Sequence, residues 1–410
     1  MAALTSLPFE TVVEILSNLS CLDQFSMTRV SRRFQLISEP LLYRSPILTK
    51  SRKTNGTGST GSSLGILLRT LLTPGREFLA SHVRCLRLMT NEVRADHASY
   101  FSTDTFIRIT LIASKFGING PLDSKAAQLM VLLDLLPGLQ VLQITALRIL
   151  SCFTQILNSN IATDTLPSGL QSLCEFRSST AQRSHQISSE TLVSYMKLPN
   201  IRTITVTSLN YHKSPAIVDA AAGTSGVTHL RFSYAYMPAS VLSPVLRVPI
   251  ALTHFSYSGV AAGNLAVSSF MAALAPLRAS LRSLHLCFRN LGDFKLLYPE
   301  GSLRDWPMLQ TLSCPLMPLL GNGKLNGSPR LMDVLPVSLR EFEVLKDLYW
   351  SVDEEVEQIV EMLKQKESAV PRLAKLAVVF GCRRRYSMAH QLEVACKAAG
   401  VSFVKESFRW

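Results

Sequence analysis

The chain has 410 residues and a formal net charge of +13 at pH 7, and 47% of its residues are hydrophobic. It is therefore long and apolar enough to bury a sizeable core in roughly one to three domains. The sequence contains no uncharged apolar run of about 18 residues, so we expect no membrane span. Residues 1–20 contain no basic residue, whereas a secretory leader begins with basic residues. The cysteines are scattered without any C-x-x-C pair, which favours reduced thiols in the cytoplasm or nucleus.

Residues 4–44 predict three short helices. Pro8 suits the first turn of a helix, Asp23 is placed to cap a second, Ser31 to cap a third, and Pro40 to end it. The apolar stripe of the first helix follows the i, i+3, i+4, i+7 spacing and consists of Val12, Ile15, Leu16 and Leu19. Three helices of this length bury only a marginal core, so we expect a module that depends on a partner.

Residues 4–44 contain a Leu-Pro pair, an Ile-Leu pair, a Val-Ser-Arg triplet and a closing Leu-Tyr pair. In the order and spacing of these motifs the segment resembles the F-box, although Phe34 stands where the family usually has tryptophan, and we expect an F-box domain over residues 1–46. The resemblance implies docking onto the Skp-type adaptor of a cullin–RING ubiquitin ligase, and an ordinary amphipathic N-terminus is the alternative. The residues expected to bind the adaptor are Leu7, Pro8, Glu10, Ile15, Leu16, Leu19, Leu22, Val30, Leu42 and Tyr43.

Residues 47–80 are expected to form a flexible linker and a connecting helix. Residues 50–63 are rich in glycine, serine and threonine, as flexible linkers are. Gly56, Gly58 and Gly61 spell G-x-G-x-x-G there, but no strand precedes them and no acid follows about twenty residues on. We therefore exclude a nucleotide-binding loop.

From residue 81 onward the sequence repeats. The template L-x-x-L-x-L, with apolar substitutions, begins at Val83, Leu139, Leu170, Ile201, Val227, Leu252, Leu281, Leu309, Leu339 and Leu373. From Leu139 the copies start about 25 to 34 residues apart, most of them after a proline that ends a candidate helix. Candidate helices are Lys125–Leu136, Glu190–Lys197, Leu265–Leu274 and Val352–Lys366. The wide gap between Val83 and Leu139 is expected to hold one further, poorly formed unit.

One strand and one helix per unit predict an α/β fold: a three-helix F-box followed by an irregular leucine-rich-repeat solenoid over residues 81–385. Irregularity is expected because the asparagine or cysteine of a regular repeat is missing after the third apolar position. A capping helix and strand are expected in residues 386–410. A non-solenoid α/β domain with periodic leucine-rich strands is the alternative.

The combination resembles F-box/leucine-rich-repeat substrate receptors. It implies a non-catalytic substrate-recognition subunit of an SCF-type ubiquitin ligase; the alternative is an interaction scaffold that binds the adaptor without forming a ligase. The sequence contains no G-x-S-x-G, H-E-x-x-H or Walker motif, so we expect no enzyme activity, cofactor or metal.

The third and fifth positions of the template point away from the core. These positions place a candidate target-binding patch on neighbouring strands, formed by His229, Arg231, His254 and His285. Together with the net charge, the patch favours an acidic or phosphorylated protein target. We expect no specific nucleic-acid binding, since no DNA- or RNA-reading motif is present, and unrelated exposed polar residues remain the alternative.

Overall fold

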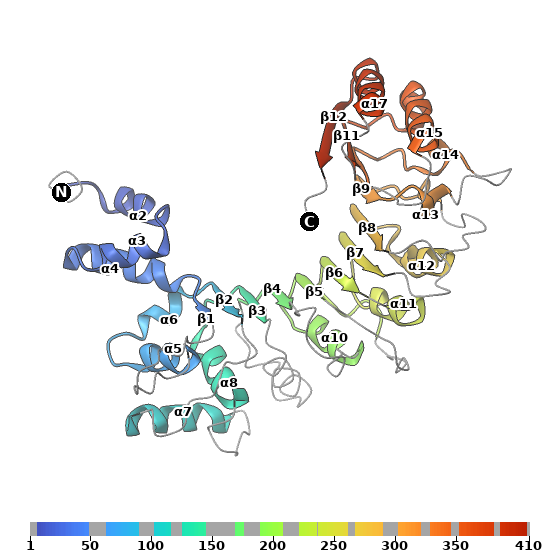
Figure 1. Cartoon of the computed structure of the whole chain (residues 1–410). Helices are drawn as coiled ribbons and strands as arrows, with labels where there is room; N and C mark the ends of the chain where they lie inside the picture. Colours follow the sequence, from blue (N-terminus) through green and yellow to red (C-terminus); the bar gives the residue numbers. More distant parts are fainter. Residues whose placement is uncertain are drawn as a thin grey trace, which may run out of the picture. The chain divides into compact units, whose positions relative to one another are not determined.

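The computed structural model describes residues 6–48, 63–89, 102–115, 125–144, 169–175, 189–207, 221–235, 237–260, 267–289, 302–320, 329–345, 352–380 and 386–407. These residues form N-terminal helices followed by twelve strands of a parallel sheet that alternate with helices (Figure 1). The chain divides into two compact units: unit 1 comprises residues 1–181 and 198–201, and unit 2 comprises residues 182–197 and 202–410. The predicted α/β fold of helices followed by strand–helix units is confirmed.

Unit 1 begins with the N-terminal helical module, which consists of α2 (Phe9–Ser17), α3 (Cys21–Met27) and α4 (Arg32–Tyr43). Its buried core contains Val12, Leu16, Phe34 and Ile37. The predicted apolar stripe therefore supplies two of these four side chains, and Phe34 fills the centre from α4.

The caps of the module differ in part from expectation. Ser31 caps α4 by accepting from Phe34 N at 3.3 Å, as predicted. The predicted cap at Asp23 is wrong: α3 begins one turn earlier, because the Ser20 hydroxyl accepts from Asp23 N at 3.2 Å and donates to its carboxylate at 2.6 Å. Pro40 lies inside α4 instead of ending it, and the turn beyond it carries Leu41, which packs against the module's core.

The rest of unit 1 joins the module to the sheet. It contains β1 (Ile47–Leu48), α5 (Ser63–Leu72), α6 (Phe78–His82), β2 (Cys85–Leu88), α7 (Thr103–Lys115), α8 (Lys125–Leu135), β3 (Val141–Ile144) and β4 (Ser172–Glu175). β1 pairs with β2, the Arg44 carbonyl accepts from Arg84 N at 2.9 Å, and Arg76 lies 3.3 Å from the Glu39 carboxylate. The module is thus held against the first strands. Most of the predicted linker, residues 49–62, lies outside the described residues.

The extra unit expected between Val83 and Leu139 is not present in the sheet. β2 pairs directly with β3, with Leu86 opposite Leu142. The described residues between these strands form α7 and α8, which contact each other. Two helices in succession explain the doubled spacing.

Unit 2 repeats the strand–helix pattern. Its elements are α10 (Ser189–Met196), β5 (Thr203–Thr207), β6 (His229–Ala235), α11 (Ala239–Arg247), β7 (His254–Val260), α12 (Val267–Leu274), a 3-10 turn (Ala275–Leu277), β8 (Ser283–Arg289), β9 (Thr311–Cys314), α13 (Met317–Leu320), α14 (Leu331–Val334), β10 (Glu341–Val344), α15 (Val352–Lys364), α16 (Lys366–Ala369), β11 (Lys375–Phe380), α17 (Tyr386–Ala398) and β12 (Ser402–Ser407). Strands β5 to β12 follow one another in chain order. The predicted C-terminal helix and strand correspond to α17 and β12.

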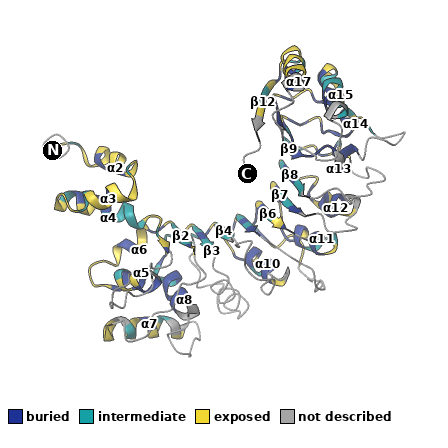
Figure 2. Cartoon of the chain, in the orientation of Figure 1, coloured by how far each residue is buried: buried dark blue, intermediate teal, exposed yellow. Residues whose placement is uncertain are grey.

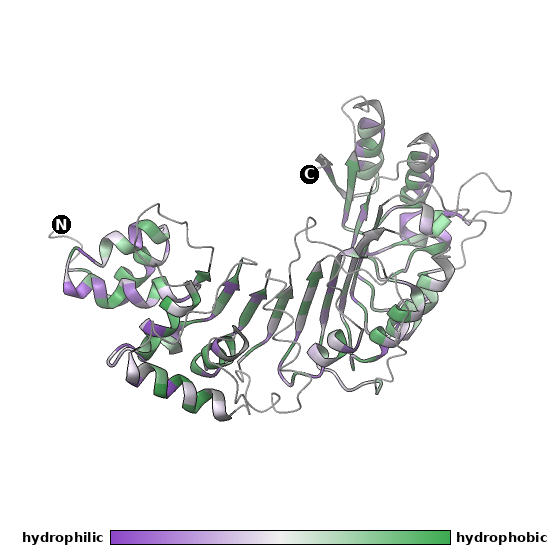
Figure 3. Cartoon of the chain, turned by 60° about the horizontal axis from the view of Figure 1, so that its bottom comes forward, coloured by the Kyte–Doolittle hydropathy of each residue, from purple (hydrophilic) through white to green (hydrophobic). Residues whose placement is uncertain are grey.

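The apolar positions of the template face the helices and are buried. On β6, Leu230 and Phe232 have almost no exposure, whereas His229 and Arg231, the residues directly before each of them, are exposed. Buried and exposed stretches of each strand and helix are coloured in Figure 2. Hydrophobic and hydrophilic residues also occur together along individual strands, as the colours of Figure 3 show. The core of unit 2 therefore lies between the strands and their helices. No helix in the described part of the chain is long and apolar enough to cross a membrane.

Candidate functional site

The N-terminal module leaves large apolar side chains uncovered. Leu22 on α3 is 80% exposed, and several other apolar side chains of the module have more than a third of their surface exposed. These additional residues are Phe9, Ile15, Phe25, Val30 and Leu36. Exposed apolar surface gathered on one small module is typical of a protein-interaction site.

The ten residues predicted to bind an adaptor occupy different environments. Exposed residues are Pro8, Glu10, Ile15, Leu22 and Val30, and partly buried ones are Leu7, Leu19, Leu42 and Tyr43. Leu16 has 1% exposure, so in this conformation it holds the module together. Arg33 fixes the Leu-Pro turn by donating to the Leu7 carbonyl at 2.7 Å. Phe9, Phe25 and Leu36 were missed, although their positions off the buried stripe were a signal.

The strands β5 to β8 carry a second candidate site on their outward side, which we call the polar strand face. Its outward residues are Thr203, Thr205, His229, Arg231, Ser233, His254, Ser256, Ser258, Ser283, His285 and Cys287. None of these residues has a carboxylate. The face consists of hydroxyl, imidazole and guanidinium groups with one thiol, a composition that suits an anionic partner.

The register of the strands separates the four predicted patch residues into two rows. His229 lies opposite His254 in one row, and their rings stack with centroids 4.0 Å apart and planes 9° apart. In the next row, Arg231 on β6 lies opposite Ser256 on β7, and Ser256 in turn lies opposite His285 on β8. The structure therefore brings the two exposed histidines into contact and places Arg231 and His285 two strands apart.

A threonine precedes each stacked histidine and holds its ring. The Thr228 and Thr253 hydroxyls each lie 2.9 Å from Nδ1 of the following histidine. Thr253 also donates to the Thr228 carbonyl at 3.0 Å, and Thr228 donates to the Arg202 carbonyl at 3.3 Å. These threonines were not singled out in the sequence; the repeated Thr-His pair in adjacent units was the available signal.

The local environment disfavours charge on two of the histidines. Burial lowers the pKa of His254, and the neighbouring His229 and Arg282 lower it further. Burial also lowers the pKa of His285, where Arg231 adds to the decrease and the Glu343 carboxylate opposes it. At neutral pH Arg231 is therefore the permanent charge of the patch, and protonated forms of His254 and His285 contribute only under more acidic conditions.

Carboxylates begin beyond the polar strand face. Glu343 on β10 accepts from the Ser313 hydroxyl at 2.5 Å, and Ser313 lies opposite His285. This hydrogen bond joins neighbouring strands β9 and β10. Among the described residues, no group of three or more histidine, cysteine or acidic side chains could hold a metal ion.

A bulge at the end of β6 turns one aromatic side chain outward. The β6–β7 register shifts between Ser233 and Ala235, and Tyr234 between them has φ +53° and is 52% exposed. The buried Tyr257 hydroxyl stabilises the bend, since it donates to the Ala235 carbonyl at 3.2 Å and accepts from Met237 N at 3.4 Å. This hydroxyl therefore satisfies backbone groups on both sides of the end of β6.

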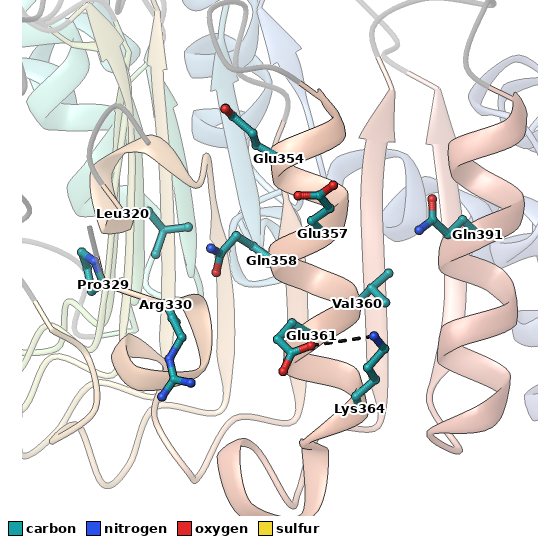
Figure 4. Close-up of a pocket in the computed structure, with 10 residues that line it drawn as sticks. All are labelled: Leu320, Pro329, Arg330, Glu354, Glu357, Gln358, Val360, Glu361, Lys364 and Gln391. Atoms are coloured by element: carbon teal, nitrogen blue, oxygen red, sulfur yellow. Dashed lines mark ion pairs between the residues drawn. The ribbon is translucent and has the colours of Figure 1, made fainter. Parts of the chain in front are cut away.

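A groove of about 420 Å³ lies on the helical side of unit 2, between α15 and its neighbours (Figure 4). Its polar groups are largely engaged within the chain: Arg330 binds Asp333 at 2.9 Å, Gln358 accepts from Leu331 N at 3.0 Å, and Lys364 lies 3.8 Å from Glu361. The hydrogen bond between Leu331 and Gln358 joins α14 to α15, and the other two contacts are local to one helix, so these groups serve the packing of the helices.

Comparison with known proteins bears on the first of these sites. The F-box domain family model matches residues 4–42, the segment that forms the N-terminal helical module. No curated protein matches the chain. The exposed apolar residues described above thus belong to an F-box domain at the N-terminus.

Proposed function

We propose that the chain is the substrate-recognition subunit of an SCF-type cullin–RING ubiquitin ligase. In this function the F-box binds a Skp-type adaptor and, through it, a cullin, while the strand–helix units, as leucine-rich repeats, bind a target protein. The observation that carries the proposal is the set of uncovered apolar side chains on a segment that matches the F-box domain. Such a subunit acts in the cytoplasm or nucleus.

The proposed receptor contributes no reacting group. It holds a lysine of the target near the ubiquitin-conjugating enzyme, and this raises the effective concentration of the two reactants. The polar strand face is the proposed target-binding surface, with His229, Arg231, His254 and His285 as its contact residues. Its lack of carboxylates favours a target that carries acidic or phosphorylated groups.

Adaptor capture by the full chain tests the first half of the proposal. Burying a large apolar side chain contributes about 1.5–3 kcal/mol, so Leu22→Ala combined with Phe25→Ala should weaken adaptor binding by roughly a hundredfold or more. Ile107→Ala with Leu111→Ala is the matched control, because both side chains are exposed on α7, away from the module. Equal adaptor binding by the two double variants would contradict the proposal.

Cullin capture separates the receptor from the scaffold alternative. A ligase subunit should bring down adaptor and cullin together, in amounts that fall in parallel in the Leu22/Phe25 variant. Adaptor without cullin would instead support a scaffold that binds the adaptor alone.

A further inference from the structure

The hydrogen bonds of Thr253 determine which nitrogen of His254 carries a proton. A threonine hydroxyl has one hydrogen, and Thr253 uses it on the Thr228 carbonyl at 3.0 Å. Its oxygen can therefore only accept from His254, which requires a proton on Nδ1. In the same way, the Thr228 hydroxyl donates to the Arg202 carbonyl, so its oxygen can only accept from Nδ1 of His229. In the neutral state both rings present a bare Nε2 to the exterior.

We propose that the stacked pair of His229 and His254 is a proton-operated binding site for an oxyanion, the group shared by phosphate and carboxylate side chains. A bare Nε2 is an acceptor and repels an oxyanion, whereas a protonated Nε2 donates a charge-assisted hydrogen bond to it. Binding therefore requires a proton from solvent to form the Nε2–H bond. The identity of the anion's source as a protein target rests on the proposed function. The existence of the oxyanion site does not depend on that function.

Among the described residues, the groups around the pair favour a bound anion, and no carboxylate lies in the pair's row on the strands next to it. On β5 the neighbour of His229 in the row is Thr203, and on β8 the neighbour of His254 is Ser283. The charged and titratable groups that the structure places near the pair are Arg202, whose carbonyl binds Thr228, Arg282, which acts on His254, and Arg231 and His285 in the next row. The first acid in the pair's row is Glu341 on β10, three strands beyond β7, or about 15 Å at the usual strand spacing.

Stacking two rings at 4.0 Å makes the proton uptake dependent on the ligand. Two imidazolium rings at this distance repel each other, and His229 already lowers the pKa of His254. An oxyanion between the two Nε2 atoms offsets that repulsion, so bound anion should raise the pKa of His254. By linkage, affinity should rise as pH falls towards the pKa of His254 in the free protein.

Sulfate titration of the full chain tests this inference without any target or adaptor. Sulfate does not change its own charge between pH 5.5 and 7.5, so a pH-dependent affinity reports the protein. We expect the sulfate Kd, followed by the NMR signals of labelled histidines, to be at least tenfold lower at pH 5.5 than at pH 7.5. His254→Asn should abolish this difference, and His390→Asn, at an exposed position on α17, should retain it.

A double threonine variant tests whether the threonines determine the tautomer of the two histidines. Thr228→Val with Thr253→Val removes the acceptors for Nδ1, so the neutral rings can carry their proton on Nε2 and donate without proton uptake. The logarithm of the ratio between the sulfate Kd at pH 7.5 and that at pH 5.5 should then fall by more than half. An unchanged melting temperature is the folding control. A pH effect that survives in this folded variant would overturn the proposed tautomer control.

Phosphoserine and N-acetylglutamate distinguish the two sources of oxyanion. Both compounds are measured at pH 5.5, because the phosphate of phosphoserine itself titrates near pH 6. Binding that is lost in His254→Asn identifies the group that the site accepts. Binding of neither, or pH-independent sulfate binding by the wild-type chain, would overturn the inference and leave the adaptor test of the proposed function unaffected. Failure of adaptor capture would in turn leave the sulfate result intact.

Discussion

Gly259 on β7 lies directly against the carbonyl group of Ala235 on β6. A β-carbon at Gly259 would overlap the Ala235 oxygen, closer than real side chains approach a backbone atom. This contact occurs where the bulge shifts the register of the two strands. A glycine on one strand therefore makes room for the bend that turns Tyr234 outward on the other.

Gly259→Ala should destabilise the protein by about 1–3 kcal/mol or more, because the added methyl group forces two paired backbones apart. Gly400→Ala is the control: Gly400 has φ +65° but open space around its Cα, so only backbone strain of about 1 kcal/mol is expected. Denaturant unfolding of both variants gives the comparison. A smaller loss for Gly259→Ala than for Gly400→Ala would contradict the close approach.

Replacing each of two buried serines by alanine should have opposite effects on the free energy of unfolding. The Ser225 hydroxyl donates to the Met196 carbonyl at 2.6 Å and accepts from Val227 N at 3.2 Å, so Ser225→Ala should cost about 1–3 kcal/mol. The Ser38 hydroxyl is buried in α4 without a hydrogen-bond partner, so Ser38→Ala should be neutral or stabilising. Free energies of unfolding test the pair, and an equal loss in both variants would refute the assigned hydrogen bonds.

Two adjacent residues of α2 allow a role in folding to be distinguished from a role in adaptor binding. Leu16→Ala removes a core side chain of the module and should lower its stability by about 2–5 kcal/mol. Ile15→Ala, at a position with 39% exposure, should leave stability nearly unchanged and weaken adaptor binding about tenfold. Thermal unfolding and adaptor titration are measured on both variants. Strong destabilisation by Ile15→Ala would contradict the observed orientation of α2.

The apolar pattern was sufficient to locate most of the fold. Leu230 and Phe232 on β6, like their counterparts on other strands, are buried where L-x-x-L-x-L requires it, because a period of two residues fixes which side of a strand meets the core. The pattern could not reveal that α7 and α8 occupy one long interval, since spacing alone does not distinguish a missing strand from an inserted helix.

The candidate sites were less predictable because they depend on contacts between distant residues. The resemblance to the F-box placed Leu16 among the adaptor-binding residues, and its burial in one core cluster with Phe34 shows that it is a core residue. On the strands, the template predicted the outward direction of His229 and His254 correctly. Their stacking, their threonine partners and the lowered pKa of His254 follow from strand register and burial, which sequence spacing does not contain.

Burial should protect two cysteines from alkylation. Burial raises the pKa of the Cys396 thiol to about 11, and it raises that of Cys314 as well, with the Glu343 carboxylate adding to the effect. At pH 8 a thiol with a pKa of about 11 is ionised in roughly one molecule per thousand, and the thiolate is the reactive form. Peptide mapping after iodoacetamide treatment should show Cys21, which is exposed, alkylated at least a hundredfold faster than Cys314 or Cys396.

The same pKa shifts make folding stability decrease at alkaline pH. Above the ordinary thiol pKa near 9 the unfolded chain releases protons from Cys314 and Cys396 while the folded chain retains them. The unfolded state then binds fewer protons, so the free energy of unfolding falls as pH rises from about 9 towards 11. Replacing both residues by alanine should reduce this fall, and Cys21→Ala is the matched control, expected to leave it unchanged. Equal pH dependence in the two variants, or rapid alkylation of Cys396 in the folded protein, would contradict the burial of these thiols.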